Sequence, residues 1–151
     1  MQGSYSKAAQ FGATCRAGRL VEAWLGWLND PSDVARFQSV MGAAFSRAGA
    51  GAIVCADWRA VGVLPSEAGD ALIELLRTGN QRLDRSAVLL PDTNAVLSLQ
   101  VERLFRAAGN PGRRAFRRVD ALLEWLAEVL RPDELQSARE FLKAVPRVSA
   151  P

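Results

Sequence analysis

Apolar runs and alternating apolar positions along the chain predict several β-strands. Residues 52–57 form an apolar run ending in Asp57, which is typical of an inner strand covered on both faces of a sheet. Residues 86–90 form a second apolar run, and Pro91 ends it because proline cannot donate a ladder hydrogen bond. Residues 20–28 alternate imperfectly and are apolar on both faces, which predicts a strand that is buried or covered by a helix or partner. Two shorter strands are predicted at residues 15–17 and 114–118.

Between and after these strands, apolar residues recur at helical spacing and predict five helices. Asp30 can cap the first helix, Pro31 suits its first position, and Asp33 complements its dipole. Asp92 and Asn94 offer capping side chains for the third helix. The five apolar stripes begin at Val34, Ala68, Leu97, Leu122 and Leu135.

The predicted order of elements is ββαβαβαβαα, which indicates an α/β fold. Because each parallel pair of strands needs a crossover connection, this order predicts a single-domain sandwich with a mixed, mostly parallel sheet and flanking helices. A chain of 151 residues is long enough to bury one core. We expect a flexible N-terminal arm at residues 1–12, the α/β domain at residues 13–145 and a C-terminal tail at residues 146–151.

The composition excludes several kinds of active site. The chain has no histidine, which excludes a histidine-based catalytic triad and histidine metal ligands within it. The two cysteines, Cys15 and Cys55, make no disulfide framework, and Cys55 is expected to be a buried free thiol. Neither of the two main glycine-rich nucleotide-binding motifs occurs, and no catalytic pair of acidic residues stands out. We therefore expect no enzymatic activity, no metal site and no cofactor.

The charge pattern adds no further candidate site. The net charge is +3, and Lys7 and Lys143 are the only lysines among the basic residues. The densest basic group consists of Arg103, Arg106, Arg113, Arg114, Arg117 and Arg118. We expect this group to form a solvated basic face and not a nucleic-acid site. The first residues lack the apolar core of a signal peptide, and no apolar stretch approaches the roughly 20 residues that span a bilayer, so we expect a cytoplasmic protein.

The loop at residues 59–67 follows the predicted inner strand and is the candidate functional site. Strand ends in open α/β sheets often line binding crevices, and tryptophan and arginine concentrate binding energy at interfaces. Asp57 and Arg59 are interpreted as a solvated ion pair at the base of the loop. Ser66 can cap the next helix or carry a regulatory phosphate, and Glu67 adds fixed negative charge. The residues expected to contact a partner are Trp58, Arg59, Val61, Val63, Leu64 and Glu67.

The segment at residues 57–72, together with the order of elements, resembles the STAS domain, the fold of bacterial anti-sigma-factor antagonists. The likeness is to the divergent branch grouped with the lipid-binding SEC14 domains, and it covers roughly residues 14–130. In the family, a loop reading Asp-Ser-Ser-Gly opens a helix, and a partner kinase phosphorylates the first serine. This chain reads Pro65-Ser66-Glu67-Ala68, so Ser66 falls on the switch position while the other three positions differ.

These observations favour a non-enzymatic regulatory module that binds another protein, such as a kinase-like or signalling partner, in a bacterial pathway. The resemblance to SEC14 domains implies an alternative, a carrier or sensor that binds a lipid or small apolar ligand. A second alternative is a subunit of a homo-oligomer, such as a homodimer, in which the last helix forms the contact. We expect no nucleic-acid partner and no membrane span.

Overall fold

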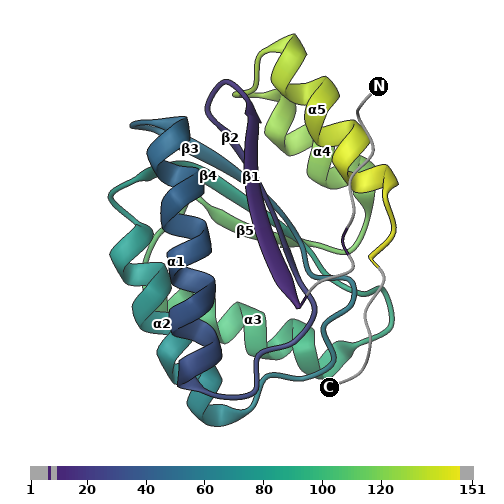
Figure 1. Ribbon diagram of the computed structural model, residues 1–151. Helices are drawn as coiled ribbons and strands as arrows, with labels where there is room; N and C mark the ends of the chain where they lie inside the picture. The colour runs from purple at the N-terminus through teal and green to yellow at the C-terminus, as the bar shows by residue number, and fades with distance from the viewer. Residues whose placement is uncertain (1–6, 8–9, 147–151) are drawn as a thin grey trace.

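A five-stranded mixed sheet forms the centre of the molecule (Figure 1). The computed structural model describes residue 7 and residues 10–146. The strands follow one another across the sheet in chain order, with the first pair antiparallel and the others parallel. They are β1 (Phe11–Ala17), β2 (Leu20–Leu25), β3 (Ala52–Asp57), β4 (Leu83–Leu89) and β5 (Arg113–Phe116). The α/β class and the element order predicted from the sequence are confirmed.

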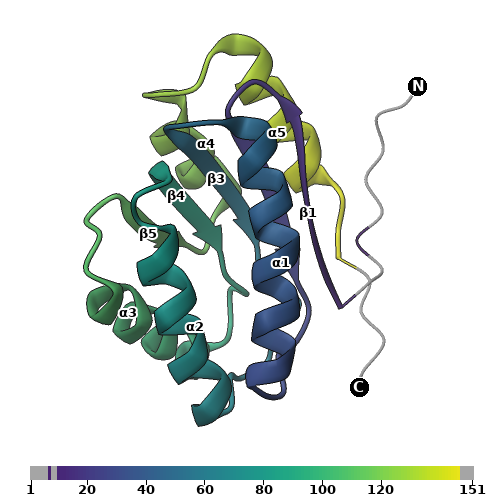
Figure 2. The ribbon, with the colours of Figure 1, turned by 60° about the vertical axis from the view of Figure 1, so that its left-hand side comes forward.

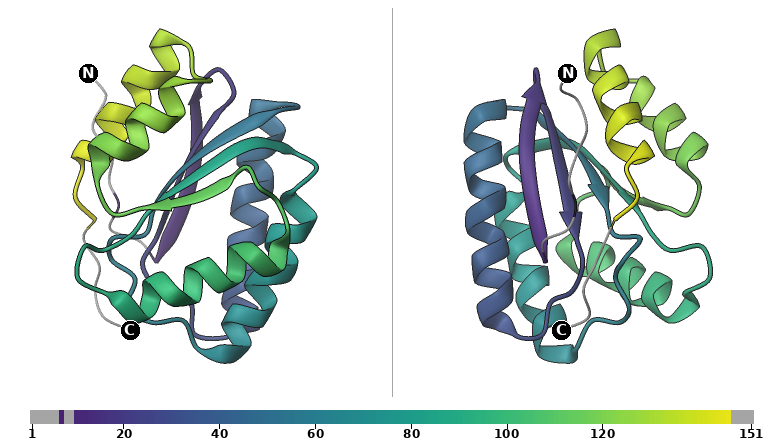
Figure 3. Two further views of the ribbon diagram at one scale, coloured as in Figure 1. Left: turned by 180° about the vertical axis from the view of Figure 1, so that it is seen from behind. Right: turned by 45° about the vertical axis from the view of Figure 1, so that its right-hand side comes forward.

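Helices cover both faces of this sheet, as the edge-on view of Figure 3 shows. The helices are α1 (Pro31–Ala48), α2 (Ser66–Gly79), α3 (Ala95–Ala108), α4 (Val119–Ala127) and α5 (Pro132–Lys143). Helices α1, α2 and α3 share one apolar core with one face of the sheet, and α4 and α5 share a second core with the other face. In Figure 2, α1 and α2 run side by side over the sheet.

Strand β3 shows why an uninterrupted apolar run belongs at the centre. Ala52, Val54 and Ala56 pack into the core beneath α1 and α2, while Ile53 and Cys55 pack into the core beneath α4 and α5. Successive side chains of a strand point to opposite faces, so a strand with helices on both sides needs apolar residues at every position. Cys55 is a buried free thiol, as predicted.

The helix caps follow the sequence at two helices and depart from it at a third. Asp30 caps α1 by accepting from the Asp33 N–H at 3.0 Å, and Asn94 caps α3 by accepting from the Leu97 N–H at 2.9 Å. The prediction that Ser66 caps α2 is wrong. Pro65 occupies the cap position without a side-chain hydrogen bond, and Ser66 is already the first helical residue, with its side chain exposed.

The hairpin of β1 and β2 also differs from the expected boundaries. Strand β1 begins at Phe11, inside the segment expected to be an arm, and β2 ends at Leu25. Gly18 makes the tight turn with a positive φ of 51°. A side chain at this position would collide with the carboxylate of Glu134, so α5 packs closely on the hairpin turn.

The last helix packs its apolar stripe against the sheet, although the sequence left open a contact with a second subunit. Ala138, Phe141 and Leu142 are buried on the second core, whereas Val145 lies beyond the helix and is exposed. No helix among the described residues combines the length and apolar character needed to cross a membrane. Most of the expected arm and tail, residues 1–6, 8–9 and 147–151, lies outside the described part of the chain.

Candidate functional site

Asp57 ends strand β3 and is fully buried at the carboxyl edge of the parallel strands. Arg59, two residues later, folds back onto it. The Arg59 Nε donates to Asp57 Oδ1 at 2.9 Å, and Nη2 donates to Oδ2 at 2.7 Å. The backbone N–H of Arg59 also donates to Oδ1 at 3.1 Å. The two residues therefore form a bidentate ion pair, and its burial corrects the interpretation of a solvated pair.

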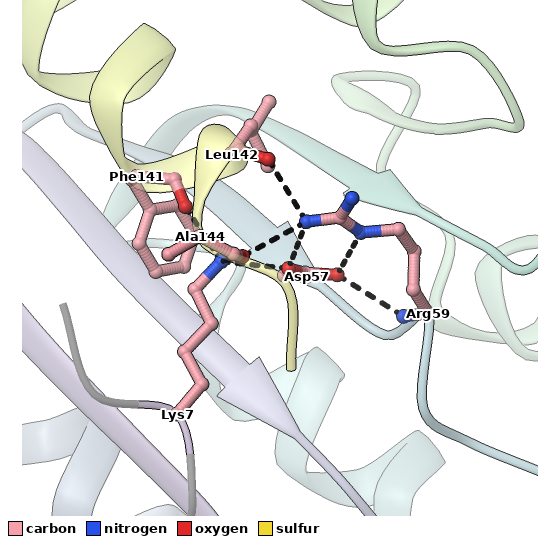
Figure 4. Close-up of polar contacts among 6 residues, drawn as sticks. All are labelled: Lys7, Asp57, Arg59, Phe141, Leu142 and Ala144. Carbon is pink, nitrogen blue, oxygen red and sulfur yellow. Dashed lines mark hydrogen bonds and ion pairs between the residues drawn. The ribbon is translucent and has the colours of Figure 1, made fainter. Parts of the chain in front are cut away.

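Lys7, which belongs to the N-terminal segment, also contacts this ion pair (Figure 4). Its Nζ donates to Asp57 Oδ2 at 2.7 Å and to the carbonyl oxygens of Phe141 at 2.6 Å and Ala144 at 2.8 Å. The ammonium also lies 3.9 Å from the centre of the Phe141 ring, and its side chain is 0% exposed. We call Lys7, Asp57 and Arg59 the basic–acidic cluster.

The basic–acidic cluster closes the end of α5. The last carbonyl groups of a helix have no partner within the helix and carry partial negative charge. Arg59 Nη2 donates to the carbonyl oxygens of Leu142 at 2.9 Å and Ala144 at 3.2 Å, beside the bonds from Lys7. Two cations therefore face one carboxylate and the negative end of a helix.

The pKa values of this cluster follow from burial and hydrogen bonding. Burial raises the pKa of the Asp57 carboxyl, but the hydrogen bonds from Arg59 and Lys7 outweigh it and bring the pKa below its ordinary value. Burial lowers the pKa of the Lys7 ammonium, and the bond to Asp57 offsets this only in part. All three N–H donors of Lys7 have acceptors, so Lys7 holds the chain together and has no donor left for a substrate.

A second buried polar pair connects α5 to the hairpin. Ser137 Oγ donates to Glu22 Oε2 at 2.8 Å, and both side chains are buried. Glu134, also fully buried, accepts from the backbone N–H groups of Arg19 and Arg131, each at 2.8 Å. The described residues contain no group of three or more histidine, cysteine or acidic side chains that could hold a metal ion.

Of the six residues expected to contact a partner, three are buried, one is paired with Asp57 and two are exposed. Trp58, Val61 and Leu64 are buried in the core beneath α1, α2 and α3, which corrects the expectation that they face a partner. They point inward because the loop at residues 59–65 folds against α3 and does not project from the surface. Arg59 is bound to Asp57, as described above. Val63 and Glu67 are exposed, and so is Ser66.

Val63 of this loop and Val96 and Leu99 of α3 are large apolar residues, which we call the apolar patch. The three side chains are 59%, 58% and 64% exposed. Two hydrogen-bonded contacts hold the loop on α3. Asn94 Nδ2 donates to the Gly62 carbonyl at 2.6 Å, and the Gln100 amide both accepts from Leu64 N–H at 3.0 Å and donates to Leu64 O at 2.8 Å.

These contacts place Val63 against the first two turns of α3. Val96 and Leu99 are three residues apart and share one helix face there. The sequence pointed to the loop, but it gave no sign that α3 contributes, because that depends on the contacts of Asn94 and Gln100. Leu99 also lines a hollow between α3 and β5.

The predicted basic group does not form a single surface. Arg113 faces α2, where it donates to the Leu76 carbonyl at 2.8 Å. Arg114 lies on the opposite face of β5, with its guanidinium 4.8 Å from the Trp125 ring, and Arg118 is paired with Asp120 at 2.7 Å. Alternation along β5 places Arg113 and Arg114 on opposite faces of the sheet.

Comparison of the chain with protein-family models and with curated proteins gave no match. The resemblance to the STAS domain therefore stays a prediction, and the proposals below are argued from the geometry of this chain.

Proposed function

We propose that the protein is a non-enzymatic module that binds another protein in a bacterial signalling pathway, in the cytoplasm. The apolar patch carries this proposal. Val63, Val96 and Leu99 are three of the four large apolar side chains that are mostly exposed among the described residues, and they belong to a loop and a helix that Asn94 and Gln100 hold together. Large apolar side chains gathered at one place on a surface are typical of interaction sites, whereas scattered ones are ordinary.

The position of Ser66 supports regulation of the same surface. Its hydroxyl is exposed, makes no hydrogen bond to another described residue, and lies two residues after Leu64, which α3 holds in place. Ser66 is the first residue of α2, where unpaired backbone N–H groups favour negative charge. A phosphate on Ser66 would add about −1.5 to −2 charges beside the apolar patch.

The experiment that tests the proposal is photo-crosslinking in cells from single positions. A photoreactive residue at position 63 or 99 should capture a partner, while one at Ser39, exposed on α1, should capture none. The captured partner should then bind the purified Val63→Asp/Leu99→Asp variant about tenfold or more weakly than the wild type. The melting temperature should stay unchanged because both side chains are exposed.

The control substitution is Ser39→Asp, which adds the same charge on another face and should leave binding intact. Equal capture from Ser39, or unchanged binding by the double variant, would contradict the proposal. Capture of a second copy of this chain would favour the homo-oligomer instead.

A further inference from the structure

A cavity of about 90 Å³ lies between α1, α2 and the sheet. Phe37 and Met41 of α1, Leu72 and Leu76 of α2 and Val54 of β3 give it an apolar lining. Ligand pockets usually measure ~300–1,000 Å³, so this space is too small for a lipid of the kind that a SEC14 domain carries. A dry cavity of about 150 Å³ can hold benzene, so the enclosed space alone holds fewer than six carbons, and a longer ligand also needs the open side described next.

Gly42 leaves one side of this cavity open. It lies in the interior of α1, where glycine is less favourable than alanine. A Cβ at Gly42 would meet nothing within 4 Å, so packing within the described chain does not require glycine there. Gly42 lines the cavity, and a side chain at this position would extend into open space beside it.

The charges around the cavity are of one sign. Arg82 and Arg113 line it, and no acidic residue does so among the residues that the structure describes. Gly79 lies between them: its carbonyl accepts from the Arg82 backbone N–H at 3.0 Å, and a Cβ on it would lie 3.6 Å from Arg113 Nη2. The two arginines thus flank the same turn at the end of α2.

Neither guanidinium has a carboxylate partner within the described residues. Arg113 donates to two neutral oxygens, the Leu76 carbonyl at 2.8 Å and Asn80 Oδ1 at 3.1 Å. Burial lowers the pKa of Arg113 to about 10, as expected for a charge without a counter-ion. The Arg82 guanidinium lies 5.2 Å from the Phe45 ring centre and makes no side-chain hydrogen bond in the described part of the protein.

Trp58 adds an unpaired donor. Its side chain lines the cavity and is buried, and its indole N–H has no hydrogen-bond partner among the described residues. Buried polar groups without a partner are rare and costly in folded proteins, which makes this N–H a candidate contact for a bound molecule.

We propose that this cavity and the open space beside Gly42 together bind a short organic anion, with an apolar body of about four to six carbons between α1 and α2 and a carboxylate or similar group at Arg82 and Arg113. The apolar lining excludes a fully hydrated ion, and the unpaired guanidinium groups favour an anion over a neutral molecule of the same shape. This ligand site lies apart from the apolar patch, so it does not depend on the proposed partner binding.

Methionine labelling tests the proposal directly, because Met1 and Met41 are the only two methionines and Met41 lines the cavity. With ¹³C-methyl methionine, hexanoate should shift the Met41 signal saturably and leave the Met1 signal in place. Hexan-1-ol, which lacks the charge, should bind about tenfold or more weakly, and sulfate, which lacks the apolar body, should not shift Met41.

Three variants separate the contributions of the two arginines and of the open side of the cavity to binding. Arg82→Gln should weaken hexanoate binding by about threefold or more without affecting hexan-1-ol, and Arg82→Gln/Arg113→Gln should bring hexanoate to the level of hexan-1-ol. Gly42→Leu, which fills the open side, should abolish the shift. Gly42→Ala is its control and should retain binding.

The proposal is overturned if hexanoate gives no saturable Met41 shift, if hexan-1-ol binds equally well, or if Arg82→Gln leaves hexanoate affinity unchanged. Arg82 makes no side-chain hydrogen bond to the described residues, so its replacement tests binding even where Arg113→Gln disturbs folding.

Discussion

At the scale of single residues, the ammonium of Lys7 has one acceptor for each of its three N–H donors. The acceptors come from β3 and from the end of α5, which are far apart in the sequence. Nothing in the composition or spacing near Lys7 indicates this role, because an isolated lysine in a polar segment is usually exposed. The ion pair of Asp57 with Arg59 could be predicted, since the two are close in sequence, but its burial depends on where α5 ends.

We predict that Lys7→Met lowers the free energy of unfolding by about 3 kcal/mol, because it leaves buried acceptors unpaired. Lys143→Met is the matched control, since Lys143 is exposed, and it should change stability by less than about 0.5 kcal/mol. Urea unfolding followed by circular dichroism measures both values. Equal effects of the two substitutions would show that the contacts of Lys7 make no net contribution to the free energy of unfolding.

The ionisation of Asp57 leads to a pH prediction. Its pKa in the folded protein lies below the ordinary value of 3.8, so the unfolded chain takes up the proton first as pH falls. The stabilisation is therefore complete above about pH 4 and is lost as pH falls through the folded-state pKa. Asp57→Asn should cost about 3–5 kcal/mol at neutral pH, and less in acid. A difference from wild type that stays constant between neutral and acidic pH would contradict this assignment.

At the scale of elements, local signals predicted those boundaries that local chemistry sets. Asp30 and Asn94 cap their helices as the sequence indicates, because each side chain reaches a backbone N–H three residues ahead. At α2, the cap lies one residue before the serine that the sequence indicates, so Ser66 is the first helical residue. Pro65 takes the cap with an extended ψ of 149°, and its carbonyl accepts the helical bond from Gly69. Residue type alone cannot distinguish a helix capped by Ser66 from one capped by Pro65.

The two helix starts should respond differently to the loss of a polar side chain. Asn94→Ala removes the cap of α3 and the bond to the Gly62 carbonyl, and we expect a loss of about 1–2 kcal/mol. Ser66→Ala removes no hydrogen bond to the described residues and should stay within about 0.5 kcal/mol. Denaturant titration of the two variants decides this, and a loss of about 1 kcal/mol on Ser66→Ala would restore its role as a cap.

At the scale of the whole molecule, the order of apolar runs was sufficient to predict two layers of helices on a mostly parallel sheet. The surface was harder to predict, because the exposure of a loop depends on what it packs against. Val61 and Leu64 turn inward, while Val63 between them stays exposed, although all three are apolar residues of one loop. The contribution of α3 to the apolar patch likewise depends on tertiary contacts of Asn94 and Gln100.

Removal of α5 tests how far the second core depends on it. Deleting residues 131–151 removes Phe141 and Leu142 from that core and leaves Glu22, Lys7 and Arg59 without their α5 partners. We expect the melting temperature to fall by on the order of 10 °C or more. A chain shortened after residue 146 keeps these contacts and is the control. An unchanged melting temperature in the longer deletion would show that α5 adds little to the fold.

The bonds from Lys7 to the carbonyl groups of Phe141 and Ala144 close the polypeptide into a ring, since Lys7 and Phe141 are 134 residues apart. Closing a flexible loop of that length costs about 4 kcal/mol of chain entropy, so these contacts form only when the intervening chain is already folded. Opening the ring requires no strand to leave the sheet. A pulling force applied to the two chain ends therefore acts on these bonds before it reaches the sheet, which makes them the first mechanical element of the fold to yield.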